Sequence, residues 1–129
     1  GSMSNGPWRH KSVTTQLTGS DVIAVVGISP NPDRPSHYVA KYLQNVGYRI
    51  IPVNPILDEV LGETSYPDLT DIPLKVDMVD VFRRTEHVLQ IVKDAVTIEA
   101  KHIWLQDGIV NMEAYHLALA SGLSVVMDN

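Results

Sequence analysis

Three arginines stand in segments that follow short apolar runs, where a folded chain can bring them to one edge of a sheet. They are Arg34, Arg83 and Arg84, and they belong to a chain with ten basic and fifteen acidic residues and a net charge of −5. The fork of an arginine guanidinium matches the oxygens of a phosphate group. On an acidic protein this placement predicts a local phosphate site. The alternative is that the three arginines are solvated loop charges.

Small and polar residues follow the same apolar runs. The first run ends at Gly27, which we expect to let a ligand approach the backbone. Ser36 is expected to cap a helix whose first N–H groups would attract an anion. The residues that stand after the first, second and fourth runs are Gly27, Ser29, Pro35, Ser36, Asn54, Pro55, Gln106 and Gly108.

The loop after the first run lacks the fingerprint of a dinucleotide site. Gly27-Ile-Ser-Pro-Asn-Pro32 keeps one of the glycines of G-x-G-x-x-G, and Asn54 stands where an acid would hold the ribose hydroxyls. These departures disfavour an NAD dehydrogenase, although an NAD(P)-dependent oxidoreductase stays open as an alternative. A ligand with a phosphate near its ribose suits Asn54 and the arginines better.

Other chemistries find no support in the residue spacing. There is no phosphate loop, no cysteine and no pair of histidines at metal-ligand spacing among the five. Ser29 lacks the second glycine of a nucleophile elbow. We therefore predict no catalytic residue and no metal ligand. Phe82, the last residue of the third run, is expected either in the core or stacked on an adenine ring.

Five apolar runs rich in β-branched residues predict five strands. They cover 21–27, 48–54, 76–82, 102–105 and 123–127. Helices are expected between them, with Ser36, Thr85 and Asn111 as caps. Only 55–75 breaks the alternation, and we expect a short helical turn plus loop there. The order predicts an α/β fold: a Rossmann-like, doubly wound, five-stranded parallel sheet with helices on both faces, in a single domain.

Helical spacing predicts the buried face of each helix. The residues expected on these faces are Val39, Ala40, Leu43 and Val46, then Val88, Leu89, Val92 and Val96, then Met112, Tyr115, Ala118 and Leu119. Gly47 and Gly122 are expected just past two helix ends. Pro52 is expected near the end of its strand, and Trp104 in the core.

Composition bounds the class of protein. Residues 1–20 are expected to be a tag scar and an N-terminal extension, and 21–129 the folded domain, which is long enough for a core. Hydrophobic residues make up 44% and charged residues 19%, as in globular proteins. The acidic charge disfavours nucleic acid as a partner. Without a long apolar run or a signal peptide, no membrane partner and a cytoplasmic location are expected.

Six segments together carry a family resemblance. They are Ala24-Val-Val-Gly-Ile-Ser-Pro30, Arg34-Pro-Ser36, Pro52-Val-Asn-Pro55, Asp80-Val-Phe-Arg-Arg84, Trp104-Leu-Gln106 and Val125-Val-Met-Asp128. The chain resembles the small stand-alone CoA-binding proteins of bacteria and archaea, which are similar to the CoA-binding domain of the succinyl-CoA synthetase alpha subunit. The resemblance implies coenzyme A, free or acylated, as the ligand. The ligand candidates are then Gly27, Ser29, Arg34, Pro35, Ser36, Asn54, Pro55, Phe82, Arg83, Arg84, Gln106 and Gly108.

The implied function is a carrier or sensor of CoA without catalysis of its own. The synthetase's phosphorylated histidine lies in a domain that this chain lacks, so an acyl-CoA ligase component acting with a partner chain is the alternative. Relatives also run on through a Met-Asp-x-Cys-like segment, so a lid or edge element is expected beyond Asn129. Adjacent strand residues diverge, so only one of Arg83 and Arg84 is expected to face the ligand. Arg84 is favoured because it stands beside Thr85.

Overall fold

The computed structural model describes residues 21–106 and 111–127. Five parallel strands form one sheet in the order β2-β1-β5-β6-β7. They are β1 (Val22–Val26), β2 (Arg49–Val53), β5 (Met78–Val81), β6 (His102–Leu105) and β7 (Ser124–Met127). The predicted five-stranded parallel sheet is confirmed. Because β2 is an edge strand and Pro52 is its penultimate residue, the proline removes no hydrogen bond from a central strand.

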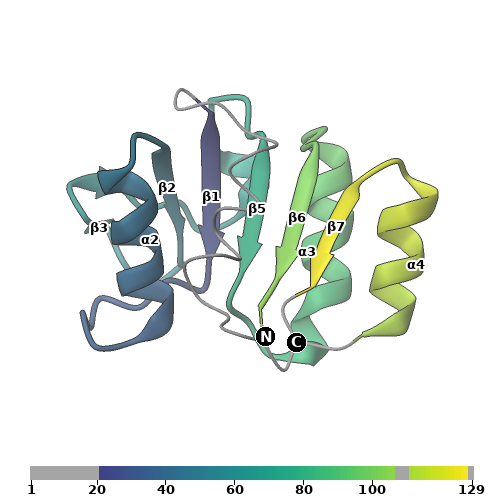
Figure 1. Cartoon of the computed structure of the whole chain (residues 1–129), viewed down its shortest axis with the longest axis horizontal. Helices are drawn as coiled ribbons and strands as arrows, with labels where there is room; N and C mark the ends of the chain where they lie inside the picture. The colour runs from purple at the N-terminus through teal and green to yellow at the C-terminus, as the bar shows by residue number, and fades with distance from the viewer. Residues whose placement is uncertain (1–20, 107–110, 128–129) are drawn as a thin grey trace.

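Helices cover both faces of the sheet, as predicted (Figure 1). They are α2 (Pro35–Asn45), α3 (Thr85–Thr97) and α4 (Met112–Ala120). Ala40 and Leu43 of α2 share one core cluster with the side chains of one sheet face, including Ile23 and Ile50. The buried residues of α3 and α4 join the cluster on the other face. In a parallel sheet covered on both faces, each strand is a nearly continuous run of apolar residues in the sequence. This pattern made the strands predictable.

The segment 55–75 differs from expectation. It forms an antiparallel hairpin of β3 (Glu59–Val60) and β4 (Glu63–Thr64), followed by the single-turn helix η1 (Leu69–Asp71). Only the helical turn was predicted. Leu61 and Gly62 make the hairpin turn, and both have positive φ angles, 56° and 76°. Such turns normally use Asn-Gly or Asp-Gly, and leucine gave no signal for one.

Two predicted helix caps are wrong and one is confirmed. The cap residues are Arg34 before α2, two residues earlier than predicted, and Arg84 before α3, one residue earlier. Pro35 begins α2 because its fixed φ suits the first helical position. Asn111 does cap α4, since its Oδ1 accepts from the Ala114 N–H at 3.0 Å.

Some residues predicted on apolar helix faces are exposed. Val46 is 47% exposed, Met112 54% and Leu119 48%. In α2 the buried positions include Ser36 and His37, and in α4 they are Ala114 and Ala118. Small residues bring α4 close to its neighbours, so Ala118 is buried as predicted while the larger Met112 and Leu119 are not. Trp104 is in the core, as predicted.

Candidate functional site

The carboxyl ends of the parallel strands bring the predicted loops to one edge. The chain leaves β1 for β2 on one side and later returns to β5 on the other, so the strand order switches beside β1. A crevice at such a switch point is the usual place for a ligand in an open α/β sheet. A cleft of about 220 Å³ opens at this edge. Its lining residues are Val26, Val53, Pro55, Pro67, Asp68, Leu69, Arg83, His87, Gln90, Ile91 and Asp94.

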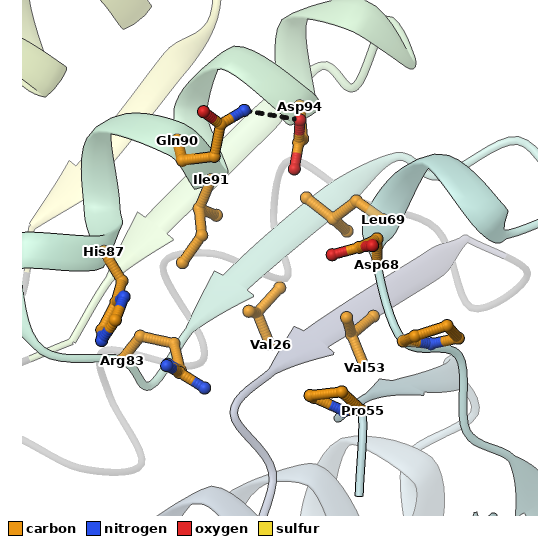
Figure 2. A pocket seen from close by; sticks show the side chains of 11 residues that line it. Val26, Val53, Pro55, Asp68, Leu69, Arg83, His87, Gln90, Ile91 and Asp94 are labelled. Atoms are coloured by element: carbon orange, nitrogen blue, oxygen red, sulfur yellow. Dashed lines mark hydrogen bonds between the residues drawn. The ribbon is translucent and has the colours of Figure 1, made fainter.

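The cleft has an apolar middle and two polar ends of unlike charge. Figure 2 shows Val26 and Val53 between the ends, where β1 and β2 stop. Arg83 and His87 form one end, here called the cation end. Asp68, Gln90 and Asp94 form the other, here called the acceptor end. A ligand with a flat apolar part and one anionic side matches this distribution.

The first loop is held by its own side chains. Ser36 Oγ accepts from the Ser29 N–H at 2.9 Å, and Ser29 Oγ accepts from the Asn31 N–H at 3.0 Å. His37 Nδ1 donates to the Ser29 carbonyl at 2.9 Å. Ser36 therefore fixes the loop after β1 instead of capping α2. Both serines occupy positions that shape this loop.

Asn54 joins the two loops that follow β1 and β2. Its Nδ2 donates to the Ile28 carbonyl at 2.9 Å, and its Oδ1 accepts from the Ile56 N–H at 3.0 Å. Both ends of the amide are thereby engaged with backbone. The side chain was predicted as a ligand candidate, and its hydrogen bonds show that it also positions the two loops. Pro55, the next residue, does line the cleft.

Gly27 lies where the ends of β1 and β5 meet. Its φ is +87°, and a Cβ built there would lie 2.7 Å from the Phe82 carbonyl oxygen and 2.8 Å from Arg83 Cδ. No side chain fits these distances. The atoms that approach the glycine most closely are those of the protein, so packing at the switch point already requires a glycine, whatever a ligand adds.

Of the two adjacent arginines, it is Arg83 that lines the cleft. Arg84 is exposed and precedes the first residue of α3. The two side chains are therefore in different surroundings. Arg84 was favoured as the ligand-facing residue because Thr85 was expected to cap α3, but the cap is Arg84 itself. Arg34 and Pro35 are exposed at the start of α2, outside the residues that line the cleft.

Phe82 and Gln106 lie beyond the cleft lining. Phe82 is partly buried and packs against the core cluster that contains α2. Gln106 Nε2 donates to the buried carboxylate of Asp80, so its amide is oriented from the centre of the sheet. Gly108 lies outside the described residues.

Four polar residues of the cleft were not predicted: Asp68, His87, Gln90 and Asp94. The last three share a face of α3, because residues three or four apart lie next to one another on a helix. That spacing was a usable signal, and it needed only the knowledge that this face of α3 borders the switch point. Asp68 carried no comparable signal, since the path of 55–75 was not predicted.

Within the described residues, no group of three or more His, Asp or Glu side chains could hold a metal ion. Searched over the same residues, no helix has the length and apolar character needed to cross a membrane.

Comparison with known proteins gives matches along the whole described chain. A family model described as a CoA binding domain matches residues 21–129. YneT, an uncharacterised protein of Bacillus subtilis, is 45% identical over 112 residues, which are 87% of this chain and 83% of that one. A solved structure of a hypothetical protein from Pyrococcus horikoshii has a TM-score of 0.85 at 36% identity and covers 98% of this chain and 87% of its own.

Larger proteins contain a similar part. An ADP-forming acetate–CoA ligase of Archaeoglobus fulgidus is 28% identical over 118 residues, which are 84% of this chain and only 17% of the ligase. A dinucleotide-forming acetyl-coenzyme A synthetase from Ca. Korarchaeum cryptofilum has a TM-score of 0.74 at 26% identity. The match covers 87% of this chain and 26% of that synthetase. The resemblance stated from sequence is confirmed.

Proposed function

The chain belongs to the CoA binding domain family, and on this premise we propose that it binds coenzyme A or an acyl-CoA at the carboxyl edge of its sheet. The adenosine part enters the cleft beside β1 and β2, and the 3′-phosphate lies toward Arg83. The pantetheine arm leaves the cleft along the same edge. In this role the protein is a carrier or sensor of CoA and has no catalysis of its own.

The observation that carries the proposal is the position and character of the cleft. It lies at the switch in strand order, where open α/β sheets take their ligands, and Arg83 lines it. Its volume of about 220 Å³ is below the roughly 300–1,000 Å³ of pockets that enclose a drug-sized ligand. It therefore suits one end of an extended ligand, such as an adenine ring, with the rest of the molecule outside.

The loops around the cleft support the proposal because they are already in place. Ser36 and Asn54 hold the loops after β1 and β2 through hydrogen bonds of 2.9–3.0 Å. A pre-formed site loses little conformational entropy when its ligand binds. The N-terminus of α2 follows the first of these loops directly, and the positive end of a helix dipole attracts an anion. The residues of the loop after β1 and of the start of α2 therefore remain ligand candidates: Ser29, Arg34, Pro35 and Ser36.

A second candidate is a component of an acyl-CoA ligase that acts with a partner chain. It is favoured by the two ligases above, in which a similar part makes up 17% and 26% of the protein. In that case the CoA site would be the same, and the chemistry would lie on the partner. A carrier or sensor binds CoA without acyl transfer, whereas the ligase component supports acyl transfer once the partner is added.

Calorimetry with CoA, dephospho-CoA and NAD tests the ligand. We expect CoA to bind more tightly than either of the others, because only CoA carries the 3′-phosphate. A charge-assisted contact contributes about 1.5–3 kcal/mol, so dephospho-CoA should bind at least tenfold more weakly. Equal binding of CoA and dephospho-CoA would rule out the phosphate contact. Tighter binding of NAD would favour the oxidoreductase instead. Mass spectrometry of small molecules released from the purified protein identifies the acyl group.

A further inference from the structure

We propose that the acceptor end of the cleft selects a 6-aminopurine over a 6-oxopurine through the carboxylates of Asp68 and Asp94. The inference rests on the proposed function, since it states which base a CoA-like ligand must carry. The ring enters the apolar middle of the cleft. Its exocyclic amino group donates hydrogen bonds at the acceptor end.

Acceptors predominate at this end, although Gln90 has a second amide N–H besides the one that donates to Asp94. Ionised carboxylates accept hydrogen bonds and donate none. Gln90 Nε2 donates to Asp94 Oδ1 at 3.1 Å, which holds Asp94 and leaves its second oxygen as an acceptor (Figure 2). The carboxylate of Asp68 is directed into the cleft from the opposite wall. A group that enters between the two carboxylates is therefore bound best when it brings donors.

The apolar walls define what kind of group can bring those donors. Val53, Leu69 and Ile91 line the middle of the cleft, and the first two are almost fully buried. The rings of Pro55 and Pro67 complete the lining. A small apolar slot with acceptors at one end fits a flat heterocycle with an amino substituent better than it fits a free ammonium ion, which would leave the apolar walls uncovered.

Charge sets the direction in which such a ligand lies. Phosphate groups are attracted to Arg83 at the cation end and repelled by the two carboxylates. The base of a phosphorylated nucleoside therefore points toward Asp68 and Asp94. Adenine presents the N–H groups of its amino substituent there, whereas hypoxanthine presents a carbonyl oxygen. An oxygen facing two carboxylates is repelled and gives neither of them the donor that the adenine amino group supplies, which is the kind of mismatch that produces specificity.

The test compares CoA with desamino-CoA, in which a carbonyl oxygen replaces the amino group of adenine. Both are titrated calorimetrically into the parent protein and into Asp68→Asn, Asp94→Asn and the double variant. We expect the parent to bind CoA at least tenfold more tightly, equivalent to about 1.4 kcal/mol. In the double variant the preference should fall below about threefold, because an asparagine amide donates to a carbonyl oxygen. Circular dichroism melts verify that each variant is folded.

Asp71→Asn is the matched control. Asp71 is an exposed carboxylate at the other end of η1 and does not line the cleft, so this variant removes the same charge and should keep the parent's preference. If the parent binds both ligands equally while still binding CoA, the inference is wrong and the proposed function stands. If Asp71→Asn loses the preference as the double variant does, or if the double variant keeps it, the assignment to Asp68 and Asp94 is wrong. If the parent fails to bind CoA, the proposed function fails and the inference with it.

Discussion

At the scale of single residues, Arg83 and Arg84 should contribute unequally to CoA binding. Arg83 lines the cleft and Arg84 is exposed. Glutamine is the better replacement because it keeps much of the aliphatic stem that packs over Gly27 and removes the charge. We expect Arg83→Gln to weaken CoA binding about tenfold or more, about 1.4 kcal/mol. The difference from the parent should shrink at high salt, where phosphate attraction is screened.

Arg84→Gln is the control and should bind CoA like the parent. Calorimetric titration of both variants at two salt concentrations makes the comparison. A larger loss in Arg84→Gln than in Arg83→Gln would move the phosphate to the exposed arginine. Parent-like binding by both variants would mean that the arginines are solvated surface charges.

Gly27 should be a residue on which folding itself depends. In Gly27→Ala the new Cβ would lie 2.7 Å from the Phe82 carbonyl oxygen, in a backbone conformation with φ of +87°. Strain of this kind costs about 1–3 kcal/mol before the steric conflict is added. We expect a loss of more than about 2 kcal/mol in the free energy of unfolding, measured by urea denaturation.

Gly62→Ala separates the two causes. Gly62 also has a positive φ, 76°, but a Cβ there meets no atom within 4 Å. It should lose only the conformational part, about 1 kcal/mol. If the two alanine variants prove equally stable, close packing at the switch point does not matter and only the left-handed backbone does.

At the scale of elements, α2, α3 and α4 end in the same way, and α3 lacks the residue that suits this ending. In each, the residue after the cap has a positive φ, and two backbone N–H groups return to the last turn. This is the pattern of a Schellman motif, which favours glycine. Gly47 and Gly122 provide it for α2 and α4, while α3 has Glu99 with φ of 61°.

Glu99→Gly should therefore stabilise the protein. An exposed glutamate in the left-handed region costs about 1–2 kcal/mol, and part of this is offset by the greater freedom of glycine in the unfolded chain. We expect a gain of about 0.5–1 kcal/mol in urea denaturation. The reciprocal change Gly122→Ala, made where a Cβ meets nothing within 4 Å, should lose a similar amount. A loss on Glu99→Gly would mean that the glutamate side chain contributes to stability by contacts.

At the scale of the whole molecule, the two edges of the sheet carry different groups. The carboxyl edge bears the cleft, and the amino edge bears charged groups around the start of β6. There Asp77 Oδ2 accepts from the Val22 N–H at 2.9 Å, and Asp77 Oδ1 lies 3.9 Å from Lys101 Nζ. The same edge holds His102, whose pKa is lowered from 6.5, chiefly by burial and further by Lys101, against the opposing charges of Asp21 and Asp77.

The lowered pKa of His102 makes the stability of the protein depend on pH. The unfolded chain binds the proton at a higher pH than the folded one does, so stability rises with pH in that range. The contribution of His102 to stability is fully present above about pH 6.5, and it falls as the pH drops from there toward the pKa of His102 in the folded protein. We expect His102→Gln to reduce the slope of unfolding free energy between pH 7 and 5, measured by urea denaturation at several pH values.

His116→Gln, on the exposed side of α4, controls for the loss of a histidine and should keep the parent's slope. Both variants should bind CoA normally at pH 7.5, because neither His102 nor His116 lines the cleft. An unchanged slope in His102→Gln would show that other groups cause the pH dependence.

The sequence alone determined the five strands of the parallel sheet, their alternation with helices, and the family. The apolar runs at 102–105 and 123–127 predicted β6 and β7, because strands of a covered parallel sheet are apolar along most of their length. Gly47, Gly122 and the cap Asn111 were found because their signals are local. Each of these features depends on residues within a few positions of one another.

Only the tertiary structure decided the composition of the cleft. It brings Asp68, Asp94 and Arg83 into one lining and leaves Arg84 outside it. It also packs the backbone of Phe82 against Gly27. It also showed that 55–75 contains a hairpin whose turn includes Leu61. Leucine is not a typical turn residue. Such contacts unite segments far apart in the chain, and their partners follow from the order in which strands pair. Hydrophobic periodicity records how deeply a residue is buried, but not which distant residue it is buried against.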